Sequence, residues 1–351
     1  MDMPEFQASS RLVGAPADPL RVVSIGGGTG LSALLHGLKL YAGGHSPARR
    51  NCSVDIVAIV TVSDDGGSSG RLRREFDVLP PGDIRNCLVA LSEDEALLSR
   101  LFQYRFESGR GLKGHSFGNL FLTALTHITG DFPDAVKECS DVLAIKGKIF
   151  PATASRVSLE AILEDGRHVQ GETKISRSRR RIETVRLCPR RCRPLPDALA
   201  ALADADLITL GPGSLFTSVI PNLLVTGIAD AIRRSPAVKA YIVNLMWQPG
   251  ETTSFTASDH IAALHRHAGG KLLDYAILNT HEIQPTLRRR YARQHSAQVE
   301  NDFEAIGAMG VNVVCGDLVH ESGLVRHNSE AIAAIAVELA AEGRARRLMS
   351  R

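Results

Sequence analysis

A short apolar run that ends in a glycine-rich turn constrains the fold of this chain more than any other stretch. Residues 22–25 (Val-Val-Ser-Ile) precede residues 26–30 (Gly-Gly-Gly-Thr-Gly), and leucines then recur at the spacing of one buried helical face, at Leu31, Leu34, Leu35 and Leu38. The pattern predicts a strand, a turn and a helix. Because glycine permits positive φ and a helix N-terminus presents free N–H groups, this turn is suited to bind a phosphate.

The turn differs from the two standard nucleotide-binding patterns. The dinucleotide fingerprint G-x-G-x-x-G requires a glycine where this chain has Leu31, and a Walker loop requires Gly-Lys-Ser/Thr, which is absent. An NAD-dependent dehydrogenase is therefore disfavoured. A tight turn without a ligand is the alternative, although four glycines cost backbone entropy that a plain turn does not need.

A second stretch predicts polar groups beside the first turn. Residues 56–63 form an apolar, β-branched run typical of a buried strand, and residues 64–73 (Asp-Asp-Gly-Gly-Ser-Ser-Gly-Arg-Leu-Arg) follow it. In a doubly wound sheet the carboxyl ends of neighbouring strands lie side by side. The carboxylates could hold a sugar hydroxyl or a hard cation, and the N–H, hydroxyl and guanidinium donors could hold phosphate. A solvated acidic turn is the alternative.

Composition narrows the class of protein. A chain of 351 residues with a net charge of +3 does not call for a nucleic-acid partner. The six cysteines lack metal-ligand or Cys-x-x-Cys spacing, so they are expected to be reduced, and no run approaches the ~20 apolar residues of a membrane span. We expect a cytoplasmic protein.

The pattern along the chain predicts one α/β domain over residues 20–342, between a disordered tail at 1–19 and a basic tail at 343–351 that begins where Gly343 ends the last helix. At about residues 155–188 the spacing of the apolar residues changes to the two-residue period of β-strands. There, residues 157–164 and 167–175 predict two strands around an Asp-Gly turn, and residues 182–187 add a third strand to this antiparallel β insertion. Its arginine run at 177–181 is interpreted as a solvated loop, with a binding patch as the alternative.

Four further segments supply polar candidates. Asp83 is a plausible helix N-cap, which places Arg85 and Asn86 in the first helical turn. His115 and Asn119 have i, i+4 spacing and should share one face at the start of a helix, either facing a ligand or serving as capping and loop-bonding groups. Residues 211–218 (Gly-Pro-Gly-Ser-Leu-Phe-Thr-Ser) repeat the strand, turn and helix pattern, and the polar loop 247–254 could be a lid.

Taken together, these motifs resemble the YvcK-like family, the gluconeogenesis factors. The resemblance runs from about residue 21 to 341 and is carried by six motifs in one order, at residues 25–30, 63–73, 81–86, 115–120, 211–218 and 248–252. It implies a Rossmann-like three-layer α/β/α fold shared with 2-phospho-L-lactate transferase. It also implies a cytoplasmic bacterial protein that binds UDP-sugars, notably UDP-N-acetylglucosamine, and is needed for cell shape, cell-wall homeostasis and growth on gluconeogenic carbon sources. The N-terminal extension, the basic C-terminal end and Trp247 depart from the family pattern.

Two functions follow as expectations. The first is a regulatory factor that binds a UDP-sugar without catalysis and needs no cofactor. The second is a Mg²⁺-dependent phosphoryl or nucleotidyl transferase, in which Asp64 and Asp65 would bind the metal. No catalytic residue is assigned, and a homo-oligomer and a regulatory protein partner are both compatible with the pattern. The expected ligand-binding residues are Gly26, Gly27, Gly28, Thr29, Gly30, Asp64, Asp65, Ser68, Ser69, Arg71, Arg85, Asn86, His115, Asn119, Gly213, Ser214, Asn244, Gln248, Glu251 and Arg326.

Overall fold

The computed structural model describes residues 18–43, 52–93 and 97–349. The predicted tail at residues 1–19 lies outside these ranges up to residue 17, so its expected disorder stays a prediction. The rest of the expected domain is described apart from two short gaps.

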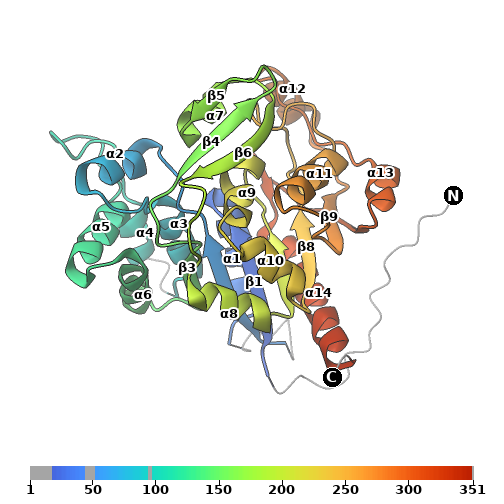
Figure 1. Cartoon of the computed structure of the whole chain (residues 1–351), viewed down its shortest axis with the longest axis horizontal. Coiled ribbons are helices and arrows are strands. Elements are labelled where there is room, and N and C mark those ends of the chain that lie inside the picture. The colour runs from blue at the N-terminus through green and yellow to red at the C-terminus, as the bar shows by residue number, and fades with distance from the viewer. Residues whose placement is uncertain (1–17, 44–51, 94–96, 350–351) are drawn as a thin grey trace.

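A seven-stranded parallel sheet forms the centre of the molecule (Figure 1). Its strand order is β10-β9-β8-β7-β1-β2-β3. The order changes direction beside β1, which pairs with β2 on one side and with β7 on the other. The strands are β1 (Leu20–Gly26), β2 (Val54–Val60), β3 (Lys148–Pro151), β7 (Leu207–Leu210), β8 (Val238–Ile242), β9 (Tyr275–Asn279) and β10 (Asn312–Gly316). Ligands of open α/β sheets bind where the order changes, at the carboxyl ends of the strands.

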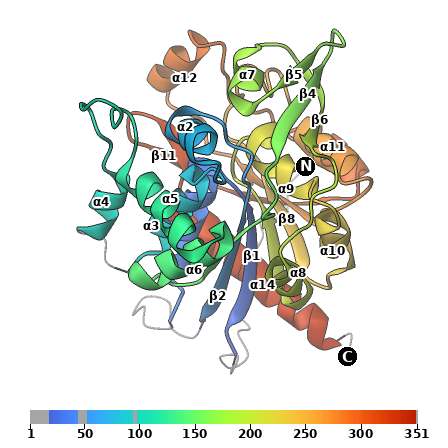
Figure 2. The same ribbon diagram turned by 60° about the vertical axis from the view of Figure 1, so that its left-hand side comes forward.

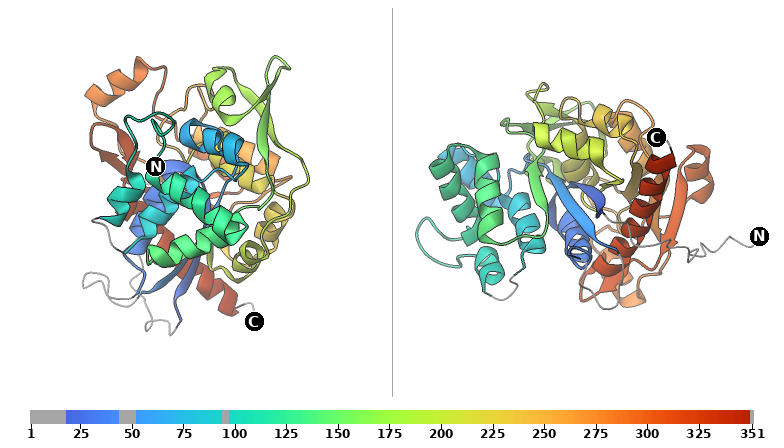
Figure 3. Two further views of the ribbon diagram at one scale, coloured as in Figure 1. Left: turned by 90° about the vertical axis from the view of Figure 1, so that its left-hand side faces the viewer. Right: turned by 90° about the horizontal axis from the view of Figure 1, so that it is seen from below.

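Helices cover both faces of this sheet, which confirms the predicted α/β/α class (Figure 3). On one face α1 (Gly28–Lys39) packs between α3 (Gly82–Leu91) and α14 (Ser329–Met349). The leucines predicted to form its apolar face are all fully buried. On the other face lie α8 (Pro196–Asp204), α9 (Ile220–Leu223), α10 (Ile228–Arg234) and the π-helix η1 (Leu215–Val219).

The remaining helices extend the two ends of the sheet (Figure 2). Beyond β3 a helical group packs on α3, consisting of α2 (Gly67–Phe76), α4 (Leu98–Gln103), α5 (Phe117–Thr129) and α6 (Phe132–Val142). Near β9 and β10 lie α11 (Ala257–His267) and α13 (Phe303–Ala308). The helix α12 (Pro285–Ala292) contacts the hairpin of β11 (Val319–Glu321) and β12 (Val325–His327), since the Val325 N–H donates to the Tyr291 hydroxyl at 3.1 Å. The sequence analysis identified neither β3 nor this hairpin, because strands of three or four residues are too short to show a period.

The antiparallel insertion is present, but its second predicted strand is too long. β4 (Ser158–Leu163) pairs with β5 (His168–Gln170) and β6 (Ile182–Cys188), while α7 (Glu172–Arg177) replaces the end of the predicted strand. Gly171 has φ 97°, a left-handed conformation that ends the strand. Asp65 then accepts a hydrogen bond from the Thr173 backbone N–H at 2.9 Å and so stabilises the first turn of α7.

The prediction of a basic tail from residue 343 is wrong, because α14 continues to Met349. Gly343 lies buried inside the helix, and a Cβ there would collide with the backbone carbonyl of Asp206. Arg344 then forms a two-point ion pair with the fully buried Asp206 carboxylate, with its Nε and a terminal nitrogen at 2.9 and 2.7 Å. The glycine therefore permits close packing instead of ending the helix.

Within the described ranges, no single helix has the length and apolar character needed to cross a membrane. One bent pair, Leu215–Leu223 with Ile228–Arg234, meets the length and composition requirements with an angle of 74° between its helices.

Candidate functional site

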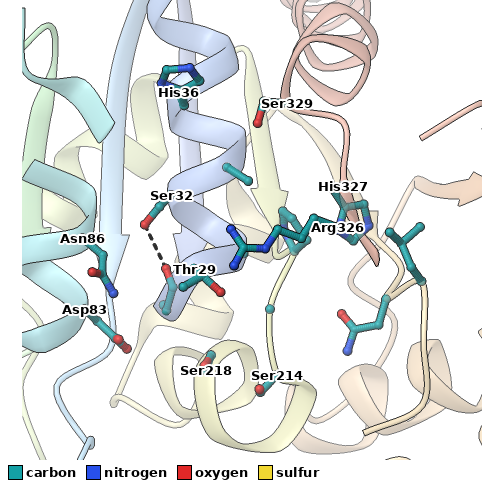
Figure 4. A pocket seen from close by; sticks show the side chains of 18 of the residues that line it. Thr29, Ser32, His36, Asp83, Asn86, Ser214, Ser218, Arg326, His327 and Ser329 are labelled. Carbon is teal, nitrogen blue, oxygen red and sulfur yellow. Dashed lines mark hydrogen bonds between the residues drawn. The ribbon is translucent and has the colours of Figure 1, made fainter. Parts of the chain in front are cut away.

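A cleft of about 970 Å³ opens at the carboxyl ends of the central strands (Figure 4). Its floor is the glycine turn between β1 and α1, and its walls come from α3, the loop after β7, the loop after β8, the start of α7 and the β11–β12 hairpin. Segments far apart in the sequence therefore meet at the place where the order of the sheet changes.

The glycine turn is shaped by close neighbours as well as by its own conformation. Gly28 has φ 64° and its N–H donates a hydrogen bond to the Asp83 carboxylate. A Cβ on Gly27 would lie 2.5 Å from Asp83 Oδ2, and one on Gly30 would lie 2.5 Å from the Pro212 carbonyl oxygen. Close packing therefore explains why positions 27 and 30 are occupied by Gly27 and Gly30, whereas the positive φ explains the glycine at Gly28.

A chain of polar side chains lines the opposite wall. Gln248 Nε2 donates to Ser214 Oγ at 2.8 Å, and Asn244 Nδ2 donates to Gln248 Oε1 at 3.3 Å. This chain links the loop after β7 to the loop after β8. It leaves uncharged donors and acceptors along the cleft, which suit recognition of a polar ligand.

Carboxyl groups gather at one end of the cleft, on Asp64, Asp83 and Glu172. Burial, strengthened by the nearby Asp64 carboxylate, raises the pKa of Asp83 to about 7 against the opposing effect of the Gly28 N–H. Burial and the same Asp64 carboxylate raise the pKa of Glu172 to about 9. Glu172 is therefore neutral at pH 7 and can donate a hydrogen bond.

Cationic and imidazole side chains gather at the other end. In Figure 4, Arg326 extends from β12 toward α1, on which Ser32 and His36 lie. His327 also lines the cleft; its Nε2 lies 3.1 Å from the Val243 carbonyl oxygen, and burial lowers its pKa to about 4. His327 is thus a neutral hydrogen-bonding group, and Arg326 supplies the positive charge at this end.

The structure brings most of the predicted ligand residues to this cleft. The ones that line it are Gly27, Gly28, Thr29, Gly30, Asp64, Arg85, Asn86, Gly213, Ser214, Asn244, Gln248 and Arg326. The remaining ones, Gly26, Asp65, Ser68, Ser69, Arg71, His115, Asn119 and Glu251, are not among its lining residues. The members of this second group are bonded to, or packed against, other parts of the fold.

The two adjacent aspartates have different surroundings. Asp64 lines the cleft and accepts a hydrogen bond from the Gly66 N–H at 2.7 Å. Asp65 accepts two hydrogen bonds from Thr173, from its N–H at 2.9 Å and its hydroxyl at 2.7 Å. No group of three His, Cys, Asp or Glu side chains in the described ranges could hold a metal ion. Of the predicted Asp64–Asp65 metal pair, only Asp64 lines the cleft, because Asp65 is engaged by the insertion.

The predicted shared face of His115 and Asn119 is wrong. α5 starts only at Phe117, with Ser116 as its N-cap, so His115 precedes the helix. His115 Nδ1 instead lies 2.9 Å from Ser68 Oγ, which ties the loop before α5 to α2. Asn119 is buried inside α5.

Two other local interpretations also change. Asp83 does not cap α3: Pro81 is the N-cap, and Asp83 lies in the first turn with its carboxyl group turned to Gly28. The polar loop after β8 is compact, since Thr252 and Glu251 are buried and the Glu251 and Thr252 N–H groups both donate to the Gln248 carbonyl at 2.9 Å. Of residues 247–254, only Gln248 lines the cleft.

Several lining residues escaped the sequence analysis, notably Ser32, His36, Ser218, Glu172, His320 and His327. Ser32 and His36 lie on α1 at four-residue spacing, on the face away from the buried leucines, and that spacing was a usable signal. Glu172, His320 and His327 lie on the insertion or on the short hairpin, and nothing in their sequence position indicates the cleft.

The fold agrees with comparisons to known proteins. The sequence pattern of the family described as 2-phospho-L-lactate transferase CofD matches residues 22–319. The chain therefore belongs to the CofD family of doubly wound α/β proteins.

Its similarity to gluconeogenesis factors within this family confirms the resemblance found in the sequence. The gluconeogenesis factor of Bacillus subtilis is 47% identical over 323 residues, which cover 92% of this chain and 98% of that protein. The gluconeogenesis factor of Listeria monocytogenes is 44% identical over 314 residues, with coverages of 89% and 93%. A crystal structure of a Bacillus halodurans protein superposes with a TM-score of 0.86 at 46% identity and covers 91% of this chain and 100% of its own.

Proposed function

We propose that this chain is a cytoplasmic regulatory factor that binds a UDP-sugar, UDP-N-acetylglucosamine or a close relative, in the cleft. Through a protein partner it supports cell shape, cell-wall homeostasis and growth on gluconeogenic carbon sources. The observation that carries the proposal is the convergence of two glycine loops, a helix N-terminus and Arg326 in one cleft of about 970 Å³. That volume lies within the range of small-molecule sites, roughly 300–1,000 Å³.

The chemistry of the cleft supports one place for the diphosphate. The N-terminus of α1 offers backbone N–H groups at Thr29 and Gly30, Ser214 offers a hydroxyl, and Arg326 offers a guanidinium opposite them. The negative charge of a diphosphate is stabilised by such donors and by the helix dipole. Asp83 and Glu172, whose pKa values are raised, lie with Arg85 on the side of the cleft away from Arg326, and they offer hydrogen-bonding groups for the uncharged parts of the ligand.

A transferase reaction is the second candidate, because the family takes its name from a transferase of a phosphorus-containing group. Asp64, Asp83 and Glu172 would then lie beside the reacting groups. In such a reaction Asp64 would hold Mg²⁺ together with the phosphates of the substrate, because Mg²⁺ needs only one or two protein carboxylates.

The test is calorimetric titration with UDP-N-acetylglucosamine and with UDP, each with and without Mg²⁺, followed by analysis of the recovered nucleotide. We expect binding and unchanged nucleotide; a new product would instead support the transferase. Arg326→Gln should weaken binding of both nucleotides by about 10- to 100-fold, the value of a lost charged hydrogen bond. Arg288→Gln, on the exposed helix α12, is the matched control. If the wild-type protein bound neither nucleotide, the proposal would be overturned.

A further inference from the structure

The antiparallel insertion contributes one polar side chain to the cleft, that of Glu172 at the start of α7. Figure 2 shows α7 beside β4 and β5, apart from the central strands that carry the glycine loops. The carboxyl group of Glu172 therefore comes to the cleft from a different part of the fold. Its position depends on how the insertion is attached to the domain.

Both ends of α7 are anchored to the domain. At the N-terminal end, Thr173 donates its N–H and its hydroxyl to Asp65 Oδ1, at 2.9 and 2.7 Å. At the C-terminal end, Ser176 Oγ donates to Glu251 Oε1 at 3.2 Å. Glu172 therefore projects from a backbone fixed on either side, and such a side chain is well placed to recognise a ligand.

The carboxyl group of Glu172 has no hydrogen-bond partner among the described residues, and it lines the cleft beside Asp64 and Asp83. Burial and the surrounding acids Asp64, Asp83, Glu251 and Asp65 keep it neutral by raising its pKa to about 9. A neutral carboxyl group both donates and accepts hydrogen bonds. A hydroxyl or amide can use both functions, whereas a phosphate oxygen can only accept.

We propose that Glu172 is a specificity-determining residue that hydrogen-bonds the hydroxyl- or amide-bearing group carried beyond the diphosphate of the ligand. This inference rests on the proposed function and adds the orientation of the ligand in the cleft. The diphosphate lies between the N-terminus of α1 and Arg326, and the sugar extends from it toward Glu172, below the insertion. Ligand choice then depends on a side chain of the insertion as well as on the glycine loops.

The experiment compares UDP-N-acetylglucosamine with UDP, which lacks the sugar, on the full-length wild-type protein, E172A and E172Q. We expect E172A to weaken UDP-N-acetylglucosamine binding about tenfold, the value of one to two hydrogen bonds, while UDP binding changes less than about twofold. E172Q should keep the preference for the sugar nucleotide, since an amide also donates and accepts. Glu164→Gln, on the exposed turn of the insertion, should change neither affinity.

A pH series adds a readout that a purely structural role would not affect. Between pH 7.5 and 10, the sugar preference of the wild-type protein should fall as Glu172 ionises, whereas that of E172Q should stay constant.

The possible failures are distinguishable. If the wild-type protein binds neither nucleotide, the proposed function fails. If the wild-type protein binds both nucleotides and E172A weakens the binding of both equally, the role of Glu172 in recognising the sugar is overturned while the proposed function stands. The same holds if E172A weakens binding only in the presence of Mg²⁺. Thermal unfolding of each variant shows whether it is folded. If E172A is not folded, E172Q still allows the comparison, because glutamine preserves the volume of the side chain.

Discussion

Asp83→Asn tests whether an acid beside the glycine loop is held in its neutral form. Asp83 carries a folded-state pKa of about 7, against an ordinary value of 3.8, because it is buried near Asp64. An acid with a raised folded pKa binds more protons in the folded state than in the unfolded state. Its contribution to stability is therefore complete below pH 3.8 and is lost as the pH rises toward 7.

The magnitude follows from the size of this shift. Between the two pKa values, the free energy of unfolding falls by about 1.4 kcal/mol per pH unit, so the interval from pH 5.5 to 7 accounts for about 2 kcal/mol. Because the Asp83 side chain is partly open to water in the cleft, we expect about 1–2 kcal/mol. Asparagine cannot ionise and still offers an oxygen to the Gly28 N–H, so D83N should lack this loss.

Urea unfolding of both proteins at pH 5.5 and pH 8 measures the effect. The stability of D83N relative to the wild-type protein should rise by about 1–2 kcal/mol between these values, in line with the pH linkage. Asp141→Asn, which removes an exposed acid from α6, should show no such difference. If the free energies of unfolding of D83N and the wild-type protein differed by the same amount at both pH values, Asp83 would not be neutral in the folded protein at pH 5.5.

Two further variants test the packing that forms the cleft and closes the fold. Gly30→Ala should cost about 1–3 kcal/mol, the usual effect of overpacking, because its Cβ would lie 2.5 Å from a proline carbonyl of the second loop. Gly307→Ala, in α13 with no atom within 4 Å of the added Cβ, should instead be neutral or stabilising by up to about 1 kcal/mol; equal effects in urea unfolding would contradict the contact. Asp206→Asn should cost about 3–5 kcal/mol because it leaves the charge of Arg344 poorly compensated, whereas Asp204→Asn, in an exposed pair at 4.0 Å, should cost less than about 1 kcal/mol. Thermal unfolding that shifts equally in both aspartate variants would show that the buried pair contributes nothing beyond surface charge.

The sequence alone determined the class of fold and the floor of the cleft. Alternating apolar runs and helical periods predicted the parallel sheet, and the glycine turn at residues 26–30 predicted where β1 ends and α1 begins. These features are local, because strand and helix periods and glycine turns depend on residues close together in the chain. For the same reason the second loop at Gly213 and Ser214 was found from its own residues.

Only the tertiary structure decided which polar groups face the cleft. Asp64 and Asp65 are neighbours in the chain, yet one lines the cleft and the other binds Thr173 of an insertion more than a hundred residues away. His115 was misplaced because the true start of α5 depends on the Ser116 cap.

The C-terminal end shows the same dependence on long-range packing. Glycine normally signals the end of a helix, but Gly343 continues α14 because the helix packs directly against the backbone at Asp206. Glu172 likewise enters the cleft only because Asp65 and Glu251 hold α7 from either side. Local patterns thus predicted the first strand, turn and helix of the sheet, and contacts between distant segments selected the side chains that the cleft presents.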